Sequence, residues 1–145
     1  MNFIKDARGL RNNNPGNIRL GIEWKGEVKG DDTAFEKFKS VEYGIRAIYK
    51  LISAYASKHG INTIHGIINR YAPSSENATD QYIQSVIKYM LDHAKATESA
   101  ILLKNKDQTV IDDLTLRTLF VAAIINHENG IQPFNLPFIE GCNDL

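Results

Sequence analysis

LTLRTLFVAAIINHENG, residues 114–130, is the stretch that decides the fold. Its apolar side chains surround the helix axis instead of forming one stripe, and a helix that is apolar on all sides is usually buried on all sides. Gly130 supplies the left-handed residue that ends such a helix. The stretch therefore predicts the central helix of an all-α domain. We expect this helix to begin at Thr109, with Asp112 and Asp113 in its first turn, where carboxylates suit the helix dipole.

Amphipathic helices are expected to pack around this central helix. From Val41 onward apolar residues recur at steps of three and four, which predicts a helix with Ser40 as its N-cap and Gly60 as its stop. A second helix over residues 64–71 is ended by Pro73. The other expected elements are a helix opened by residues 77–79, a short helix from Thr97 to Leu103, a hairpin near Gly30 within an irregular stretch over residues 1–40, and a surface loop from Ile131 onward.

The composition is that of one ordinary globular domain, residues 1–145. A chain of 145 residues can fold without disulfides or metal. Lys plus Arg and Asp plus Glu are 17 each, and this balance argues against a dedicated nucleic-acid binder. No apolar run could span a membrane, and residues 1–11 lack the apolar core of a secretory signal. We therefore expect a chain made in the cytoplasm, without nucleic-acid or membrane partners, and Cys142 as a spare thiol in a mobile tail.

Glu128 is the strongest candidate for chemistry. It lies at the end of the most hydrophobic helix, where an apolar wall and the negative end of the helix dipole both favour a protonated carboxyl group. A protonated glutamate can donate its proton to a leaving oxygen. Hen-type lysozyme is the known example of such an acid in a hydrophobic pocket. The alternative is an exposed residue at a helix end, where a negative charge is mildly unfavourable.

A polar loop near the N-terminus is the second candidate. Residues 8–19 read RGLRNNNPGNIR and contain four asparagines, whose amides suit the hydroxyl and acetamido groups of sugars. Trp24 follows in the triplet Trp-Lys-Gly and offers an aromatic face to a sugar ring. We expect Asn14, Asn17 and Trp24 to bind sugar. The same asparagines are equally suited to Asx turns and helix caps.

The segment from Tyr71 to Tyr82 is the third candidate. Asn77 or Thr79 is expected to cap the helix that begins there, while the two tyrosines either line a groove or belong to the core. Glu76 is a second choice for the acid.

Other candidates are weaker. Glu98 is followed by Ser99 and an apolar helical run, so we expect it on an ordinary helix surface. His127 could orient Glu128, although a lone histidine is more often a packed or exposed neighbour. The remaining histidines have no metal-ligand spacing, and there is no phosphate-binding glycine loop.

The motif RNNNPGNIR over residues 11–19, with Trp24-Lys25-Gly26 after it, resembles a group of small phage virion proteins and lysins. The resemblance continues almost to the end of the chain. It includes Phe35 to Phe38, Gly44 to Ala47, Arg70 to Pro73, Glu76 to Thr79, Tyr82-Ile83 and His127 to Gly130.

A more distant resemblance connects the chain with the lysozyme-like glucosaminidases of glycoside hydrolase family 73. These enzymes have a helix ending in Glu, then an Asn-rich loop, a Trp-x-Gly hairpin, a strand entering a helix and a Tyr-Ala-containing segment. This chain is similar in rotated order, with its Asn loop at residues 14–19 and its Glu helix ending at residues 126–130. A circular permutation accounts for the rotation, because domain termini often lie close together. The resemblance implies that the C-terminal tail returns near Arg8 and that Glu128 shares a cleft with the Asn loop.

The resemblance implies a mainly α, lysozyme-like domain with a small β-hairpin, acting as an endolysin-type muramidase, glucosaminidase or lytic transglycosylase. Glu128 would protonate the glycosidic oxygen of a β-1,4 bond in peptidoglycan. A second carboxylate, to activate water, is expected among Glu27, Asp31 and Asp32. Without one close enough, internal attack gives a 1,6-anhydro sugar. The residues expected to bind sugar are Asn14, Asn17, Trp24, Tyr71, Asn77, Tyr82 and Asn129, and no metal or other cofactor is implied.

The expected partner is the peptidoglycan glycan strand. We expect a monomer that stays in the host cytoplasm until it is released to the cell wall, or that is packaged in the virion. The alternative from another class is a non-catalytic, glycan-binding or structural virion protein, which would keep the cleft and lose the acid. An amidase or peptidase would need a zinc set or a Cys–His pair, and Cys142 in a tail is a poor nucleophile. The acid is present on a suitable helix, which favours the enzyme.

Overall fold

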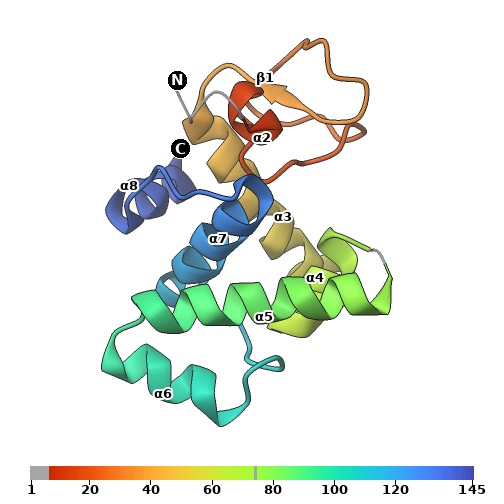
Figure 1. Cartoon of the computed structure of the whole chain (residues 1–145). Helices are drawn as coiled ribbons and strands as arrows, with labels where there is room; N and C mark the ends of the chain where they lie inside the picture. The colour runs from red at the N-terminus through yellow and green to blue at the C-terminus, as the bar shows by residue number, and fades with distance from the viewer. Residues whose placement is uncertain (1–6, 74) are drawn as a thin grey trace.

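The computed structural model describes residues 7–73 and 75–145 and is mainly helical (Figure 1). Its elements in chain order are α2 (Arg8–Arg11), β1 (Glu27–Val28), β2 (Lys37–Phe38), α3 (Val41–His59), α4 (Ile64–Tyr71), α5 (Glu76–His93), α6 (Ala96–Lys104), α7 (Leu114–Asn129), α8 (Leu136–Gly141) and the 3₁₀ turn η1 (Cys142–Asp144). The expected mainly α domain with a small hairpin is confirmed.

Helix α7 runs through the middle of the molecule, as its all-round apolar sequence predicts (Figure 1). Every residue from Thr118 through Ile125 is buried. Gly130, with a φ of 74°, ends the helix in the left-handed conformation. The prediction that α7 begins at Thr109 is wrong. It begins at Leu114, and Asp113 is its N-cap, accepting a hydrogen bond of 2.8 Å from the amide of Leu116.

The residues before α7 are extended because they pair with the loop that leads into α4. The amide of Ile111 donates to the carbonyl of Asn62 at 2.8 Å, and the amide of Ile64 donates to the carbonyl of Thr109 at 3.1 Å. Burial of Ile111 accompanies this pairing. A contact across so many residues is not visible in a local helical pattern.

The surrounding helices agree with the expected spans to within a few residues. Helix α3 follows Ser40 and ends at Gly60, whose φ is 65°. Helix α5 begins at Glu76, and its N-cap is Ser75, whose hydroxyl accepts from the amide of Ala78 at 3.3 Å. The expected caps at Asn77 or Thr79 are therefore wrong by a few residues. Similarly, α6 begins at Ala96, after Lys95 and not after Thr97.

The C-terminal tail is not a surface loop. Helix α8 and the turn η1 fold back onto the protein, and the side chains of Ile139 and Cys142 are buried. The Cys142 thiol donates to the carbonyl of Phe138 at 3.3 Å, and burial raises its pKa to about 11. The expectation of a thiol in a mobile tail is therefore wrong.

The N-terminal part, residues 7–40, contains only short helical and strand elements. Strands β1 and β2 pair antiparallel, with Glu27 opposite Phe38 and Val28 opposite Lys37. The one-turn helix α2, absent from the sequence prediction, packs against α7 at the end that carries Glu128. Among the described residues, no helix is both long and apolar enough to cross a membrane.

Candidate active site

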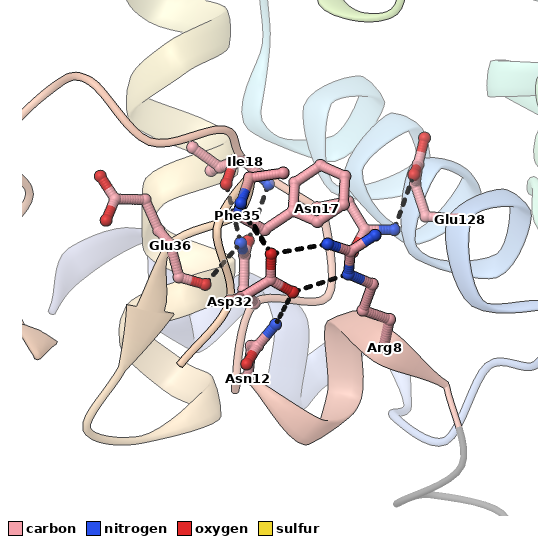
Figure 2. Close-up of polar contacts among 10 residues, drawn as sticks. Arg8, Asn12, Asn17, Ile18, Asp32, Phe35, Glu36 and Glu128 are labelled. Atoms are coloured by element: carbon pink, nitrogen blue, oxygen red, sulfur yellow. Dashed lines mark hydrogen bonds and ion pairs between the residues drawn. The ribbon is translucent and has the colours of Figure 1, made fainter. Parts of the chain in front are cut away.

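Glu128 is half-buried in the last turn of α7, and hydrogen bonds hold both oxygens of its carboxylate. The Asn17 amide nitrogen Nδ2 donates to Oε1 at 2.9 Å, and the Tyr82 hydroxyl donates to Oε2 at 2.7 Å. Figure 2 shows the side chain of Asn17 directed toward the carboxylate. Glu128 therefore lies beside the Asn loop, as expected, although Asn17 is 111 residues away in sequence. The two donated hydrogen bonds orient the carboxyl group.

The Asn loop owes its shape to left-handed backbone and to a buried amide. Asn17 and Asn13 have φ angles of 50° and 51°, in a region where asparagine is enriched. The buried side chain of Asn14 accepts from the amide of Ile18 at 2.9 Å and donates to the carbonyls of Ile18 at 2.9 Å and Glu36 at 3.0 Å. The prediction that Asn14 binds sugar is wrong, because its amide is fully used inside the loop.

Asn129 is likewise a structural residue. Its Nδ2 donates to the carbonyl of Pro15 at 2.7 Å and to the carbonyl of Ile125 at 2.8 Å. The first bond joins the end of α7 to the loop and the second lies within α7, so both amide hydrogens are used inside the protein and the prediction that Asn129 binds sugar is wrong.

Gly9 makes the close approach of helix and loop possible. A Cβ atom at this position would lie 2.7 Å from the carbonyl oxygen of Asn14, 2.8 Å from Asn129 Oδ1 and 2.9 Å from Asn17 Oδ1. No side chain larger than hydrogen fits there without moving at least one of these groups.

A cavity of about 640 Å³ opens in front of Glu128. Its lining residues are Asn17, Arg19, Phe35, Tyr71, Ala72, Pro73, Ala78, Tyr82, His127 and Glu128. The expected ligand-binding residues Asn17, Tyr71 and Tyr82 are thus brought together with the expected acid. A pocket of this size with aromatic walls and a few converging polar groups is typical of a small-ligand site.

The two tyrosines hold the wall of this cavity. The Tyr71 hydroxyl donates to the carbonyl of Gly16 at 2.5 Å, and Tyr82 donates to Glu128. Burial, and then the negative charge of Glu128, raises the pKa of both phenols well above 10. Tyr82 is only 6% exposed and belongs to the hydrophobic core as well as to the cavity. The sequence left open whether these tyrosines belong to the core or line a groove, and Tyr82 does both.

Asp32 cannot be the second carboxylate. It accepts two hydrogen bonds of 2.6 Å from the guanidinium of Arg8, one of 3.2 Å from Asn12, and two from the amides of Ala34 and Phe35 at 2.9 and 3.0 Å (Figure 2). The Arg8 contact is the largest of the effects that hold the pKa of Asp32 far below its usual range. These bonds make Asp32 the anchor of the loop, so its prediction as a catalytic group is wrong.

Glu27 and Asp31 are also absent from the lining of the Glu128 cavity. Glu27 lines a separate cavity with Glu36, and Asp31 is exposed. Burial, and then the charge of Glu27, raises the pKa of Glu36. The structure therefore does not bring Glu27 or Asp31 into one cavity with Glu128. Among the residues that the structure describes, Glu128 is the one carboxylate that lines its cavity.

The remaining sequence candidates lie away from Glu128. Trp24 lines a neighbouring cavity of about 320 Å³, and its indole nitrogen is buried without a hydrogen-bond partner. Glu76 is exposed in the first turn of α5. Glu98 caps α6 by accepting from the amide of Lys95 at 3.2 Å. The side chain of Asn77 lies outside the part of the chain that the structure describes.

Three residues of the cavity wall were not predicted or were weak candidates. The Arg19 guanidinium lies 5.2 Å from the ring centroid of Phe35, and the His127 ring lies 3.7 Å from that of Tyr82. Burial lowers the pKa of His127. Arg19 belongs to the RNNNPGNIR motif and Phe35 to the segment from Phe35 to Phe38 in the same resemblance, and these motifs were the available signals.

Metal-ligating side chains do not cluster in the described part of the chain. In residues 7–73 and 75–145 no three His, Cys, Asp or Glu side chains gather in a way that could hold a metal ion.

Comparison with known proteins gives a family but no activity. No protein-family model matches the chain, so the likeness to glycoside hydrolase family 73 stays a prediction. Among curated proteins, Protein P5 of Pseudoalteromonas phage PM2 is 40% identical over 133 residues, which cover 88% of this chain and 74% of Protein P5. The chain belongs to the same family as Protein P5 of Pseudoalteromonas phage PM2.

Proposed function

We propose that this protein cleaves the β-1,4 bonds of the peptidoglycan glycan strand, with Glu128 as general acid and a 1,6-anhydro sugar as product. The observation that carries the proposal is one oriented carboxylate in a cavity lined by aromatic, amide and guanidinium groups. Hydrolytic glycosidases generally use two carboxylates about 5–9.5 Å apart, one of which activates water or attacks the sugar. The candidates for that second group are engaged or lie elsewhere, and this favours internal attack.

In this reaction Glu128 acts first as acid and then as base. Its proton passes to the bridging oxygen as the bond from the sugar carbon C1 to that oxygen breaks. The C6 hydroxyl of the same sugar then forms a bond to C1, and the proton of that hydroxyl passes to the Glu128 carboxylate. Atoms and charge balance, and no water is consumed. Asn17 and Tyr82 hold the carboxyl group throughout, so that it exchanges protons along one direction.

The test is mass spectrometry of muropeptides released from purified sacculi by the parent protein and by Glu128→Gln. Glutamine keeps the shape, since its oxygen can accept from Asn17 and its nitrogen can donate to the oxygen of Tyr82, but it delivers no proton. We expect anhydro-sugar products from the parent and a loss of about 10²- to 10⁴-fold in the variant. Glu76→Gln, an exposed change outside the cavity, is the matched control and should keep parental activity.

Other products would change the assignment. Reducing sugar ends in place of anhydro ends would show that the bond is hydrolysed. The mechanism would then require a group that activates water. Binding of sacculi without cleavage by the parent would favour the non-catalytic, glycan-binding virion protein.

The bacterial wall is the proposed place of action. A relative encoded by a phage suggests that the protein meets the bacterial wall either from the particle at infection or from the host cytoplasm at lysis. Immunoblotting of purified particles distinguishes these two routes.

A further inference from the structure

The cavity of Glu128 adjoins a second one of about 320 Å³. Asn17, Arg19, Tyr71 and Pro73 line both cavities and form their common wall. We call the second cavity the side arm. The rest of its lining consists of Trp24, Tyr55, Arg70 and four aliphatic residues, Ile18, Leu20, Ile22 and Leu51.

The side arm carries positive charge without a matching negative charge. Arg19 and Arg70 line it, and no carboxylate does so among the residues that the structure describes. The Arg70 guanidinium lies 5.5 Å from the ring centroid of Tyr55, and its nitrogen is 3.1 Å from His59 Nε2. Neither arginine forms an ion pair with a described residue.

This combination suits a ligand that carries carboxylates. A guanidinium group placed over an aromatic ring is partly pre-oriented, and its planar donors match the two oxygens of a carboxylate. The backbone of a glycan strand made of N-acetylated sugars offers no such charge at each sugar, whereas the peptide stems attached to the strand end in free carboxylates. The arm also begins at the wall shared with the Glu128 cavity, where the sugar bearing the stem would lie.

We propose that the side arm binds a carboxylate of the peptide stem, through Arg70 and Arg19, while the sugar is held next to Glu128. The proposal rests on the proposed function and specifies its substrate as a strand that still carries peptides. The arm would then select wall glycan over unsubstituted polymers of N-acetylated sugars.

Binding of soluble strand fragments to the Glu128→Gln variant tests this inference without turnover. Calorimetry compares peptide-bearing tetrasaccharides with the same fragments after conversion of their stem carboxylates to amides. We expect the amidated fragments to bind about five- to tenfold more weakly, the size of one or two partly exposed charge-assisted contacts. Adding Arg19→Gln and Arg70→Gln should abolish the difference. Lys106→Gln, an exposed change outside the cavities, should preserve it.

The possible failures can be told apart. Equal affinity for both fragments, together with cleavage of both by the parent, would overturn the side-arm proposal and leave the proposed function standing. Absence of binding and of cleavage with either fragment would overturn both. Circular dichroism of each variant establishes that the exposed arginine changes leave the fold intact.

Discussion

Replacement of Tyr82 by Phe removes one hydroxyl group and little else. The ring of Tyr82 is packed in the core and against His127, and phenylalanine keeps that packing. What disappears is the 2.7 Å hydrogen bond from the hydroxyl to Glu128 Oε2. Asn17 remains as the donor to the other oxygen, so the carboxyl group keeps one of its two orienting contacts.

The expected loss of unfolding free energy and of turnover follows from the type of this hydrogen bond and from its exposure to water. A hydrogen bond to a charged group contributes about 1.5–3 kcal/mol when the partner is left without a substitute. Glu128 is half-buried beside an open cavity, so water can replace part of the contact. We therefore expect Tyr82→Phe to lower the free energy of unfolding by about 1–2 kcal/mol and, through poorer orientation of Glu128, to lower turnover of sacculi by about 5- to 30-fold.

A double-mutant cycle isolates the contact. Glu128→Ala is used in it because glutamine could still hydrogen-bond to Tyr82. Urea unfolding of the parent, Tyr82→Phe, Glu128→Ala and the double variant gives the coupling energy, which we expect to be about 1 kcal/mol. Tyr71→Phe is the matched control, because the Tyr71 hydroxyl donates to the Gly16 carbonyl and should show no coupling to Glu128. A Tyr82–Glu128 coupling below about 0.3 kcal/mol, the usual limit of additivity, would refute the reasoning.

Three further predictions follow from contacts at and around the site. Gly9→Ala places a Cβ within 2.9 Å of three oxygens, so we expect a loss of about 1–3 kcal/mol in unfolding free energy and reduced turnover. Gly141→Ala, with open space around it, should change neither the unfolding free energy nor the turnover. Equal effects of the two changes would contradict the close approach at Gly9. Burial lowers the pKa of His127 in the folded protein, so as the pH falls this histidine is protonated more readily in the unfolded chain than in the folded one. The free energy of unfolding should therefore decrease as the pH drops below about 6.5. His127→Gln should flatten that slope in urea titrations, and an unchanged slope would exclude His127 as its cause. Buried Cys142, with a pKa of about 11, should react with iodoacetamide at pH 8 only after denaturant is added; rapid labelling of the native protein would contradict its burial.

Periodic hydrophobicity predicted the helical frame because the energetics there are local and repetitive. Helix α7 is buried from Thr118 to Ile125, as its sequence requires, and the glycine stops at Gly60 and Gly130 lie where they were expected. The errors come from long-range contacts. Thr109 is drawn into an extended segment by the loop before α4.

The candidate site was predicted in part for a similar reason. The position of Glu128 could be predicted from one helix, but the choice among Glu27, Asp31 and Asp32 depends on how a loop is folded. Arg8 contributes most to the anchoring of Asp32, through contacts across 24 residues that no local pattern contains.

Residue type alone could not separate the asparagine that lines the cavity from those that hold the loop and helix together, because the two kinds lie side by side. Successive residues of a helix point about 100° apart, so Glu128 can face the cavity while Asn129 faces the loop and fixes the helix end to Pro15. The loop repeats this division, with Asn14 turned inward to the backbone and Asn17 turned outward to Glu128. The inward-facing amides of Asn14 and Asn129 thus fix the backbone that positions Asn17 and Glu128 at the cavity. Changes at Asn14 or Asn129 should therefore impair the cavity through its geometry, even though neither residue lines it.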